Sequence, residues 1–147
     1  MMRLFFAFIL AVAMAGCATR PLSELEVRNL EEKVFEGNYD NAYKATLQVL
    51  QDKGFIIENT DFAAGTIKAA TEKPVRTMMG GLTFRHVASI TVEQFGKNTV
   101  KERISLFLEA AQNSRFLTAE RERDPKYIQD FYAAIQKEIF VRENLNK

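Results

Sequence analysis

The chain has a single cysteine and a single histidine among its 147 residues. One cysteine excludes an internal disulfide and any metal site built from several cysteines, and one histidine excludes a zinc site rich in histidine. An excess of charge of either sign is also lacking, because 20 basic residues stand against 19 acidic ones. Such a chain has no basic footprint for nucleic acid. Its 47% apolar and 27% charged residues are typical of one ordinary globular domain.

Motifs that carry out chemistry are scarce as well. There is no Gly-x-Ser-x-Gly nucleophile elbow, and Gly80-Gly81 lacks the lysine and the spacing of a phosphate-binding loop. His86 and Ser89 would point to opposite faces of a strand, so they do not form a catalytic pair. The adjacent acids Glu31 and Glu32 are expected to be solvated rather than to act as a glycosidase pair. We therefore expect no catalytic residue, no metal and no enzyme; a hydrolase that uses His86 is the least favoured hypothesis.

The one long hydrophobic run lies at the start of the chain. After Met1-Met2-Arg3, the residues from Leu4 to Ala15 carry no charge. As a helix this run would extend about 18 Å, which is shorter than the roughly 30 Å hydrocarbon core of a bilayer. A basic start followed by a short apolar core is typical of a secretory signal peptide.

The run ends in Met14-Ala15-Gly16-Cys17, which resembles the lipobox of bacterial lipoproteins. The resemblance implies cleavage between Gly16 and Cys17, a diacylglyceryl group on the thiol of Cys17, and an acyl group on its new amino terminus. Several acyl chains on one residue hold a protein stably to a membrane, whereas one holds it only marginally. By the same resemblance, Ala18 in place of Asp favours the periplasmic face of the outer membrane over the inner membrane. The alternative is a soluble periplasmic protein with an unpaired thiol.

These features divide the chain into three parts. We predict a lipoprotein signal peptide over residues 1–16, the lipidated cysteine with a short tether over residues 17–24, and a single α+β domain over residues 25–147. Cleavage would remove only Arg3 from the charged residues, which leaves the mature chain formally neutral. The tether would extend to about 25 Å, so the folded domain is expected close to the membrane surface.

Hydrophobic patterning in the rest of the chain predicts strands and two amphipathic helices. The expected strands lie near residues 30–35, 55–58, 66–70, 84–95 and 100–110, and the expected helices cover residues 40–53 and 124–139. Asp40 is the predicted cap of the first helix, Gly54 its left-handed stop, and Asp124-Pro125 the start of the second. Residues 72–82 are predicted to form a loop, and residues 111–123 a loop or a short edge strand.

The resulting order, β-α-β-β-β-β-α, predicts two helices packed on one face of an antiparallel sheet of four to five strands. The hairpin of residues 84–110 is expected to have one dry face and one wet face. In its first strand the dry face carries His86, Ala88, Ile90 and Val92, and the wet face carries Arg85, Ser89, Thr91 and Glu93.

Three stretches together resemble a known group of proteins. They are residues 50–55 (LQDKGF) followed by 65–69 (GTIKA), residues 100–109, and the helix that begins DPKY at residue 124 and runs to Ile139-Phe140. In these stretches the chain resembles small proteobacterial lipoproteins that mostly lack an assigned activity. Its layout is also similar to the helix-grip domains of the C subunit of the outer-membrane β-barrel assembly machinery, which is an accessory scaffold. The resemblance implies a helix-grip-like fold and a non-enzymatic role.

Two stretches are candidates for contact with a partner. Met78 and Met79 stand beside Gly80 and Gly81, and flexible thioethers next to glycines can form an adaptable surface. Arg115-Phe116, followed by Arg121 and Arg123, can contact a protein partner or lipid headgroups. The alternatives are a loop whose methionines pack against the sheet and, around residue 115, a solvated polar linker.

The sequence thus predicts a non-enzymatic lipoprotein of the outer membrane that faces the periplasm. We expect it to bind an envelope protein as a scaffold or accessory subunit in assembly or maintenance of the cell envelope, with lipid on Cys17 as its only attached group. The alternative is a periplasmic module that binds a lipid or small molecule in a cleft between helix and sheet. A tightly filled helix–sheet interface would argue against that alternative.

Overall fold

The computed structural model describes residues 22–71, 76–78, 82–112 and 115–145. Within these ranges the chain forms a seven-stranded antiparallel sheet and three helices, so the predicted α+β class is confirmed. The helices are α2 (Glu24–Leu30), α3 (Tyr39–Asp52) and α4 (Pro125–Leu145). The strands are β1 (Glu32–Glu36), β2 (Phe55–Asp61), β3 (Thr66–Thr71), β4 (Arg76–Met78), β5 (Leu82–Gly96), β6 (Thr99–Gln112) and β7 (Arg115–Arg121).

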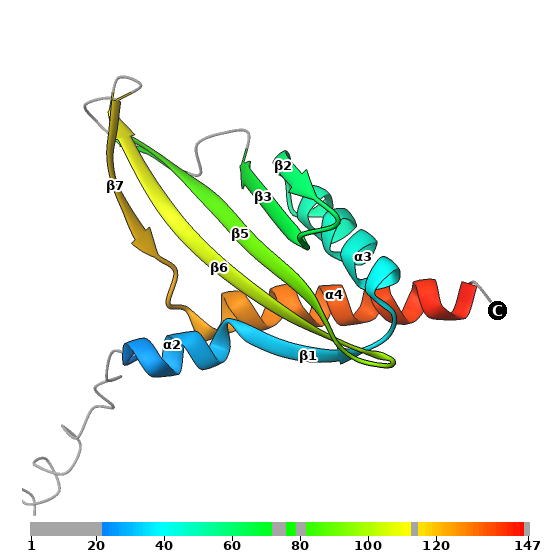
Figure 1. Cartoon of the computed structure of the whole chain (residues 1–147). Coiled ribbons are helices and arrows are strands. Elements are labelled where there is room, and N and C mark those ends of the chain that lie inside the picture. Colours follow the sequence, from blue (N-terminus) through cyan, green and yellow to red (C-terminus); the bar gives the residue numbers. More distant parts are fainter. Residues whose placement is uncertain (1–21, 72–75, 79–81, 113–114, 146–147) are drawn as a thin grey trace, which may run out of the picture.

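The two long strands β5 and β6 form the centre of the sheet. In one half the strand order is β1-β6-β5-β3-β2, and in the other half β7 pairs with β6 and β4 with β5. The helices α3 and α4 pack against each other on one face of the sheet, and the shorter α2 lies at its edge beside the start of α4 (Figure 1). The molecule is therefore a two-layer structure whose core lies between the helices and the inner face of the sheet.

The sheet has more strands than the four to five predicted. β4 forms within residues 72–82, which were predicted to be a loop, and β7 forms within residues 111–123, for which a short edge strand was one of the two alternatives. β4 pairs with β5 from Arg76↔Phe84 to Met78↔Leu82, and β7 pairs with β6 from Phe107↔Arg121 to Gln112↔Arg115. Neither segment alternates clearly between apolar and polar residues. Both form because β5 and β6 extend beyond β3 and β1, and the extensions offer unpaired backbone groups that a neighbouring strand satisfies.

The folded domain also begins slightly earlier than predicted, with a helix in place of the end of the tether. Ser23 caps α2 in a capping box, in which the Glu26 amide donates to Ser23 Oγ at 3.3 Å and the Ser23 amide donates to Glu26 Oε2 at 2.7 Å. The first strand consequently starts at Glu32 rather than near Leu30.

The ends of the two long helices are mostly as predicted. Asn38, and not Asp40, caps α3, because its Oδ1 accepts a hydrogen bond from the Asn41 amide at 2.8 Å. Gly54 follows α3 with a φ of 81°, which confirms the left-handed stop. At the start of α4, Asp124 Oδ1 accepts a hydrogen bond from the Lys126 amide at 2.9 Å, which confirms the Asp-Pro start.

Apolar side chains fill the space between the helices and the sheet. The largest of those that are at most 2% exposed are Leu50, Ile67, Ile90, Ile104, Leu106, Ile128, Phe131, Ile135 and Ile139. The alternation predicted in residues 84–95 is confirmed, because Ala88, Ile90 and Val92 are buried and their neighbours Ser89, Thr91 and Glu93 are exposed. The stripe on α4 is likewise part of the core, down to Ile139 at 2% exposed.

Candidate binding groove at the edge of the sheet

The partner-contact residues predicted from the sequence lie only partly in the described chain. Cys17 with Gly16, and Met79 with Gly80 and Gly81, are outside the described residues. Met78 ends β4 and pairs with Leu82, which pairs with Gln112, which in turn pairs with Arg115. The strand register therefore brings the two predicted contact stretches to the same end of the sheet.

Phe116 is 60% exposed in β7, next to Leu117 at 49%, so it remains available for contact.

His86 lies on the inner face of β5, where it packs against the first turn of α4. Its ring centre is 5.3 Å from that of Tyr127, and its Nε2 is 3.9 Å from Glu122 Oε2. Ser89 is exposed on the opposite face, so the prediction that the two do not form a pair is confirmed. Among the described residues, no group of three or more His, Cys, Asp or Glu side chains is placed to hold a metal ion.

Glu31 is buried, and the expectation that it is solvated was wrong. Its side chain is 1% exposed. Glu31 Oε1 lies 3.1 Å from Arg121 Nε. Glu31 Oε2 lies 3.7 Å from an Arg103 guanidinium nitrogen and accepts a hydrogen bond from Ser105 Oγ at 3.2 Å. The reason is α2, which places Glu31 at the helix C-terminus against β6 and β7 rather than within a strand. The Tyr132 hydroxyl donates to the Glu31 backbone carbonyl and ties the same point to α4.

A second buried acid, Glu102, was not identified from the sequence. It occupies an inward position of β6 between Val100 and Ile104. It is fully buried, and Thr46 Oγ1 lies 2.9 Å from its Oε1. Burial raises the pKa of Glu102 to about 8, and the hydrogen bond with Thr46 lowers that pKa only in part. Thr46 Oγ1 lies 2.9 Å both from Glu102 Oε1 and from the Ala42 carbonyl oxygen, so its single proton is shared between these two acceptors.

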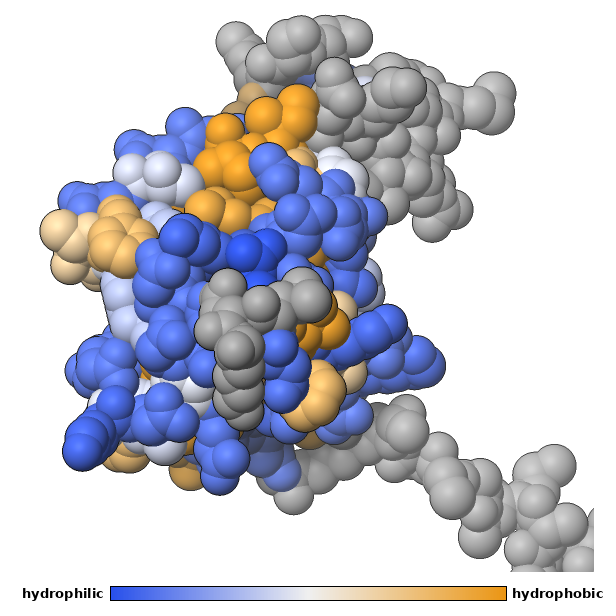
Figure 2. Space-filling view, turned by 90° about the vertical axis from the view of Figure 1, so that its right-hand side faces the viewer, coloured by the Kyte–Doolittle hydropathy of each residue, from blue (hydrophilic) through white to orange (hydrophobic). Residues whose placement is uncertain are grey.

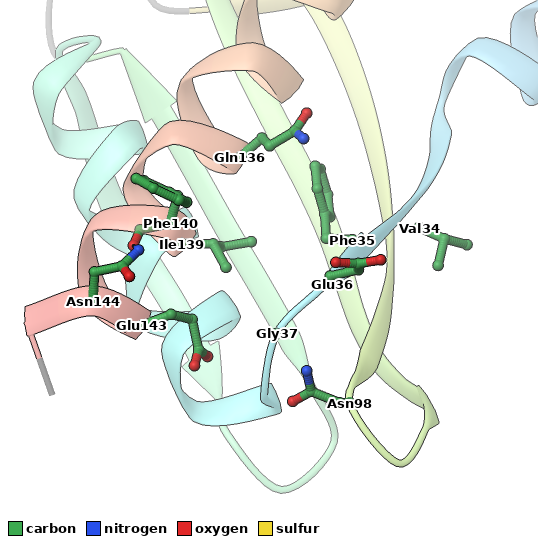
Figure 3. A pocket seen from close by; sticks show the side chains of 10 residues that line it. All are labelled: Val34, Phe35, Glu36, Gly37, Asn98, Gln136, Ile139, Phe140, Glu143 and Asn144. Carbon is green, nitrogen blue, oxygen red and sulfur yellow. The ribbon is translucent and has the colours of Figure 1, made fainter. Parts of the chain in front are cut away.

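A groove runs between the open edge of β1 and the C-terminal half of α4. Its volume is about 510 Å³. The residues that line it are Val34, Phe35, Glu36, Gly37, Asn98, Gln136, Ile139, Phe140, Glu143 and Asn144. Figure 3 shows the residues of α4 on one side and those of β1 on the other, with Phe35 and Ile139 facing each other between the two elements. These two side chains are 3% and 2% exposed, so they form an apolar floor.

Polar contacts bound the two ends of the groove. At one end Lys33 Nζ donates to Gln136 Oε1 at 3.4 Å. At the other end Glu143 Oε1 accepts from the Asn38 amide at 3.1 Å and from Asn41 Nδ2 at 2.8 Å. The groove is thus a fixed feature, in which α4 is tied to both the start and the end of the β1–α3 segment.

Exposed apolar side chains flank this groove. Val34 is 49% exposed on β1, and Phe140 and Val141 are 68% and 37% exposed on α4. Figure 2, which looks at this end of the molecule, shows hydrophobic residues as separate areas on a mostly hydrophilic surface. The buried apolar floor together with these three exposed side chains makes the groove a candidate surface for contact with another molecule.

The backbone of β1 completes the site. The Gly37 amide donates to Asn98 and the Glu31 carbonyl accepts from Ile104, at 3.0 and 2.8 Å, so odd-numbered residues of β1 bond to β6. Because successive residues of a strand point their backbone groups in opposite directions, the N–H and C=O groups of Glu32, Val34 and Glu36 point away from β6, to an edge where no strand of the described chain pairs with them. β1 therefore offers a row of backbone donors and acceptors.

Comparison with protein-family models gives no match for this chain, and a search of curated proteins finds no match either. The resemblance to helix-grip lipoproteins therefore stays a prediction. In the described part of the chain, none of the helices is both long enough and apolar enough to span a membrane.

Proposed function

We propose that this protein is a non-enzymatic lipoprotein of the outer membrane, facing the periplasm, that binds a protein partner as a scaffold or accessory subunit of the cell envelope. The observation that carries the proposal is the sequence Met14-Ala15-Gly16-Cys17 after a basic start and a short apolar run. Acyl chains on Cys17 would hold the chain to the membrane.

The position of α2 supports a placement close to the membrane. The fold begins at Ser23, so the few residues from Ala18 to Leu22 extend to less than about 20 Å. Glu24 is held to β7 and the following loop, with its carboxylate 3.5 Å from Arg121 and 2.5 Å from Arg123. The end of the domain that carries α2 would therefore lie next to the lipid.

The groove supports the binding role. It is lined by the end of β1, the β5–β6 turn and the C-terminal half of α4, which lie at the opposite end of the molecule from α2 (Figure 1). A tethered domain of this shape would present the groove to the periplasm. The alternative, a ligand cleft between the helices and the sheet, gains no support from the described core, because buried apolar side chains occupy that interface.

Replacement of the acylated residue tests the anchor. The substitution Cys17→Ser should move the protein from the membrane fraction to the soluble periplasmic fraction, because no thioether can form. The substitution Ala18→Asp is the matched variant, and it should keep the protein membrane-bound but shift it to the inner membrane. Wild-type protein that fractionates as soluble, or whose amino terminus is unmodified by mass spectrometry, would contradict the anchor.

Crosslinking in intact cells tests the partner. Wild-type protein should be recovered covalently joined to another envelope protein, and a crosslinking group placed at Val34 should give a higher yield than one placed at the exposed Lys44 on α3. Recovery of the wild-type protein only as a monomer would count against a scaffold role.

A further inference from the structure

The open edge of β1 has an uneven distribution of charge. The side chains of Glu32, Val34 and Glu36 lie on the outer face of the sheet, because Phe35 and Lys33 alternate toward the helices. Glu32 and Glu36 are exposed, and neither forms an ion pair within 4.0 Å among the described residues. The edge therefore presents two carboxylates on either side of an apolar side chain, and Arg103 and Lys101 of β6 lie behind Glu32 and Val34 on the same face of the sheet.

This arrangement disfavours a second copy of the chain. Two β1 strands that paired antiparallel about Val34 would place Glu32 of each copy directly opposite Glu36 of the other. Like charges directly opposite each other destabilise a pair of strands. A segment with basic residues at the same two positions would instead form opposite-charge pairs, so the charges select a partner of the opposite sign.

The groove beside the edge adds a requirement for apolar side chains. In a strand added along β1, residues that alternate with the basic ones would point to the inner side, toward Phe35, Ile139 and Phe140. The C-terminal end of α4 reaches the same groove, and its partial negative charge also favours a cationic segment.

We infer that β1 is an acceptor edge for an extended segment of the partner protein, which adds to the sheet as a further strand. The segment has the pattern basic–apolar–apolar–apolar–basic, with its basic side chains opposite Glu32 and Glu36 and its inner apolar side chains in the groove between β1 and α4. The backbone groups of Val34 and its neighbours supply affinity, and the charges and the groove supply specificity. This inference rests on the proposed function, because it gives the chemistry of the partner.

A short peptide tests the inference on the full acylated protein in detergent micelles. The probe is a fluorescent peptide with the symmetrical sequence Lys-Leu-Val-Leu-Lys, which reads the same in both chain directions. Fluorescence anisotropy should show that it binds at least about tenfold more tightly than Glu-Leu-Val-Leu-Glu. Amide hydrogen exchange should slow on binding in residues 32–36 and remain unchanged in β2, the other outer strand of this half of the sheet.

Two variants separate backbone pairing from charge. Val34→Pro removes the backbone N–H that points away from β6, so no hydrogen bond between β1 and β6 is lost. Proline is tolerated at such positions of an edge strand. It should weaken peptide binding at least tenfold, whereas Val34→Thr, which keeps the N–H, should leave it nearly unchanged. The double variant E32K/E36K should reverse the preference in favour of the glutamate peptide, and it tests the charge pattern even if Val34→Pro impairs folding.

Three outcomes overturn the inference. They are equal binding of the two peptides, binding that leaves exchange in residues 32–36 unchanged, and dimers that protect residues 32–36 without peptide. A failure of the proposed function is seen elsewhere, in the fractionation of wild-type protein and Cys17→Ser. A protein that stays membrane-bound and crosslinks to a partner, but binds the lysine peptide no better, contradicts the acceptor edge alone.

Discussion

At the scale of single residues, Glu102 places a carboxyl group in the apolar interface between β6 and α3. Its pKa of about 8 is above the value of 4.5 expected for an unfolded chain. Between these pH values the folded protein keeps a proton that the unfolded chain releases. The contribution of Glu102 to the free energy of unfolding is therefore fully present below about pH 4.5. It falls by up to about 1.4 kcal/mol per pH unit as the pH rises from there, and its loss is complete above about pH 8.

The substitution Glu102→Gln should remove this dependence, because an amide stays neutral and its oxygen still accepts a hydrogen bond from Thr46 Oγ1. Urea unfolding at pH 5 and pH 8 should show a large loss of stability for the wild type and a smaller one for the variant. Glu32→Gln, an exposed neighbour of β6, serves as the control and should keep the wild-type slope. Equal slopes for wild type and Glu102→Gln would show that Glu102 is ionised in the folded protein.

Gly54 and Gly65 both have a left-handed backbone conformation, so their alanine variants can be compared for their effect on stability. A Cβ on Gly65 would lie 2.0 Å from the Val92 carbonyl oxygen, and the Gly65 carbonyl accepts from the Val92 amide at 2.7 Å. A Cβ on Gly54 would meet nothing within 4 Å. Their φ values are 69° and 81°, so both alanine variants bear the left-handed cost, but only Gly65→Ala also disrupts a strand contact.

We expect Gly54→Ala to lower the free energy of unfolding by about 1 to 2 kcal/mol, and Gly65→Ala to lower it by clearly more. Chemical denaturation of both variants measures the difference. Equal losses would mean that the β2–β3 turn can move away from β5 at little cost.

At the scale of elements, the short helix α2 depends on Glu31 for its attachment to the sheet. The Glu31 carboxylate is the shared partner of Arg103 on β6 and Arg121 on β7. Removal of one member of a buried ion pair typically costs about 3 kcal/mol. The cost here should be smaller, about 2 kcal/mol, because Arg121 also contacts Glu24 and the side chains of Arg103 and Arg121 are 34% and 25% exposed to solvent. We therefore expect Glu31→Gln to be destabilising by roughly that amount, whereas Glu32→Gln should change stability by less than about 0.5 kcal/mol.

Thermal unfolding and urea unfolding of both variants check this prediction. Hydrogen exchange in residues 24–30 adds a local measurement, because α2 should lose protection in Glu31→Gln before the rest of the domain does. A variant as stable as the wild type would show that the two arginines find other partners.

The predictable elements are those in which apolar residues repeat in the sequence at the spacing of a buried helix or strand face. The alternation from His86 to Glu93 and the stripe on α4 identify their own buried faces, and Gly54 and Pro125 mark helix ends by their backbone chemistry. α2 shows the converse case, because Val27 is its only buried residue and gives no stripe. Its capping box at Ser23 and Glu26 was the one available signal.

The remaining features depend on contacts between distant segments. Glu31 is buried against β6 and β7, and no local pattern distinguishes it from a solvated acid. Glu102 differs, because the alternation of Val100, Ile104 and Leu106 in β6 places it on the apolar face, and this signal could have identified it as buried. β7 forms because β6 extends past β1. The groove could not be predicted either, since its walls come from β1, the β5–β6 turn and α4, and only the tertiary structure brings them together.

At the scale of the whole molecule, α4 links the end next to α2 with the end that carries the groove. Its 21 residues extend over about 31 Å. In the proposed function the lipid lies next to α2, so the groove would stand well away from the membrane surface. The exposed residues Arg28 on α2 and Lys97 in the β5–β6 turn mark these two ends.

Fluorescent labels at these ends measure the orientation. Cys17 is the only cysteine and would be acylated, so an introduced cysteine is the one free thiol. In vesicles that carry a headgroup quencher, a label on Arg28→Cys should be quenched more strongly than a label on Lys97→Cys. Equal quenching would show that the domain lies flat or tumbles on its tether.

One wall of the groove comes from β1, near the start of the described domain, and the other from α4, near its end, and this separation has a consequence for biogenesis. A chain exported from its amino terminus would emerge with the acylation site first and the last wall of the groove only at the end of synthesis. If Cys17 is acylated as proposed, prematurely terminated products would reach the membrane without α4 and so without one wall of the groove. In the proposed function such products would not bind the partner through the groove.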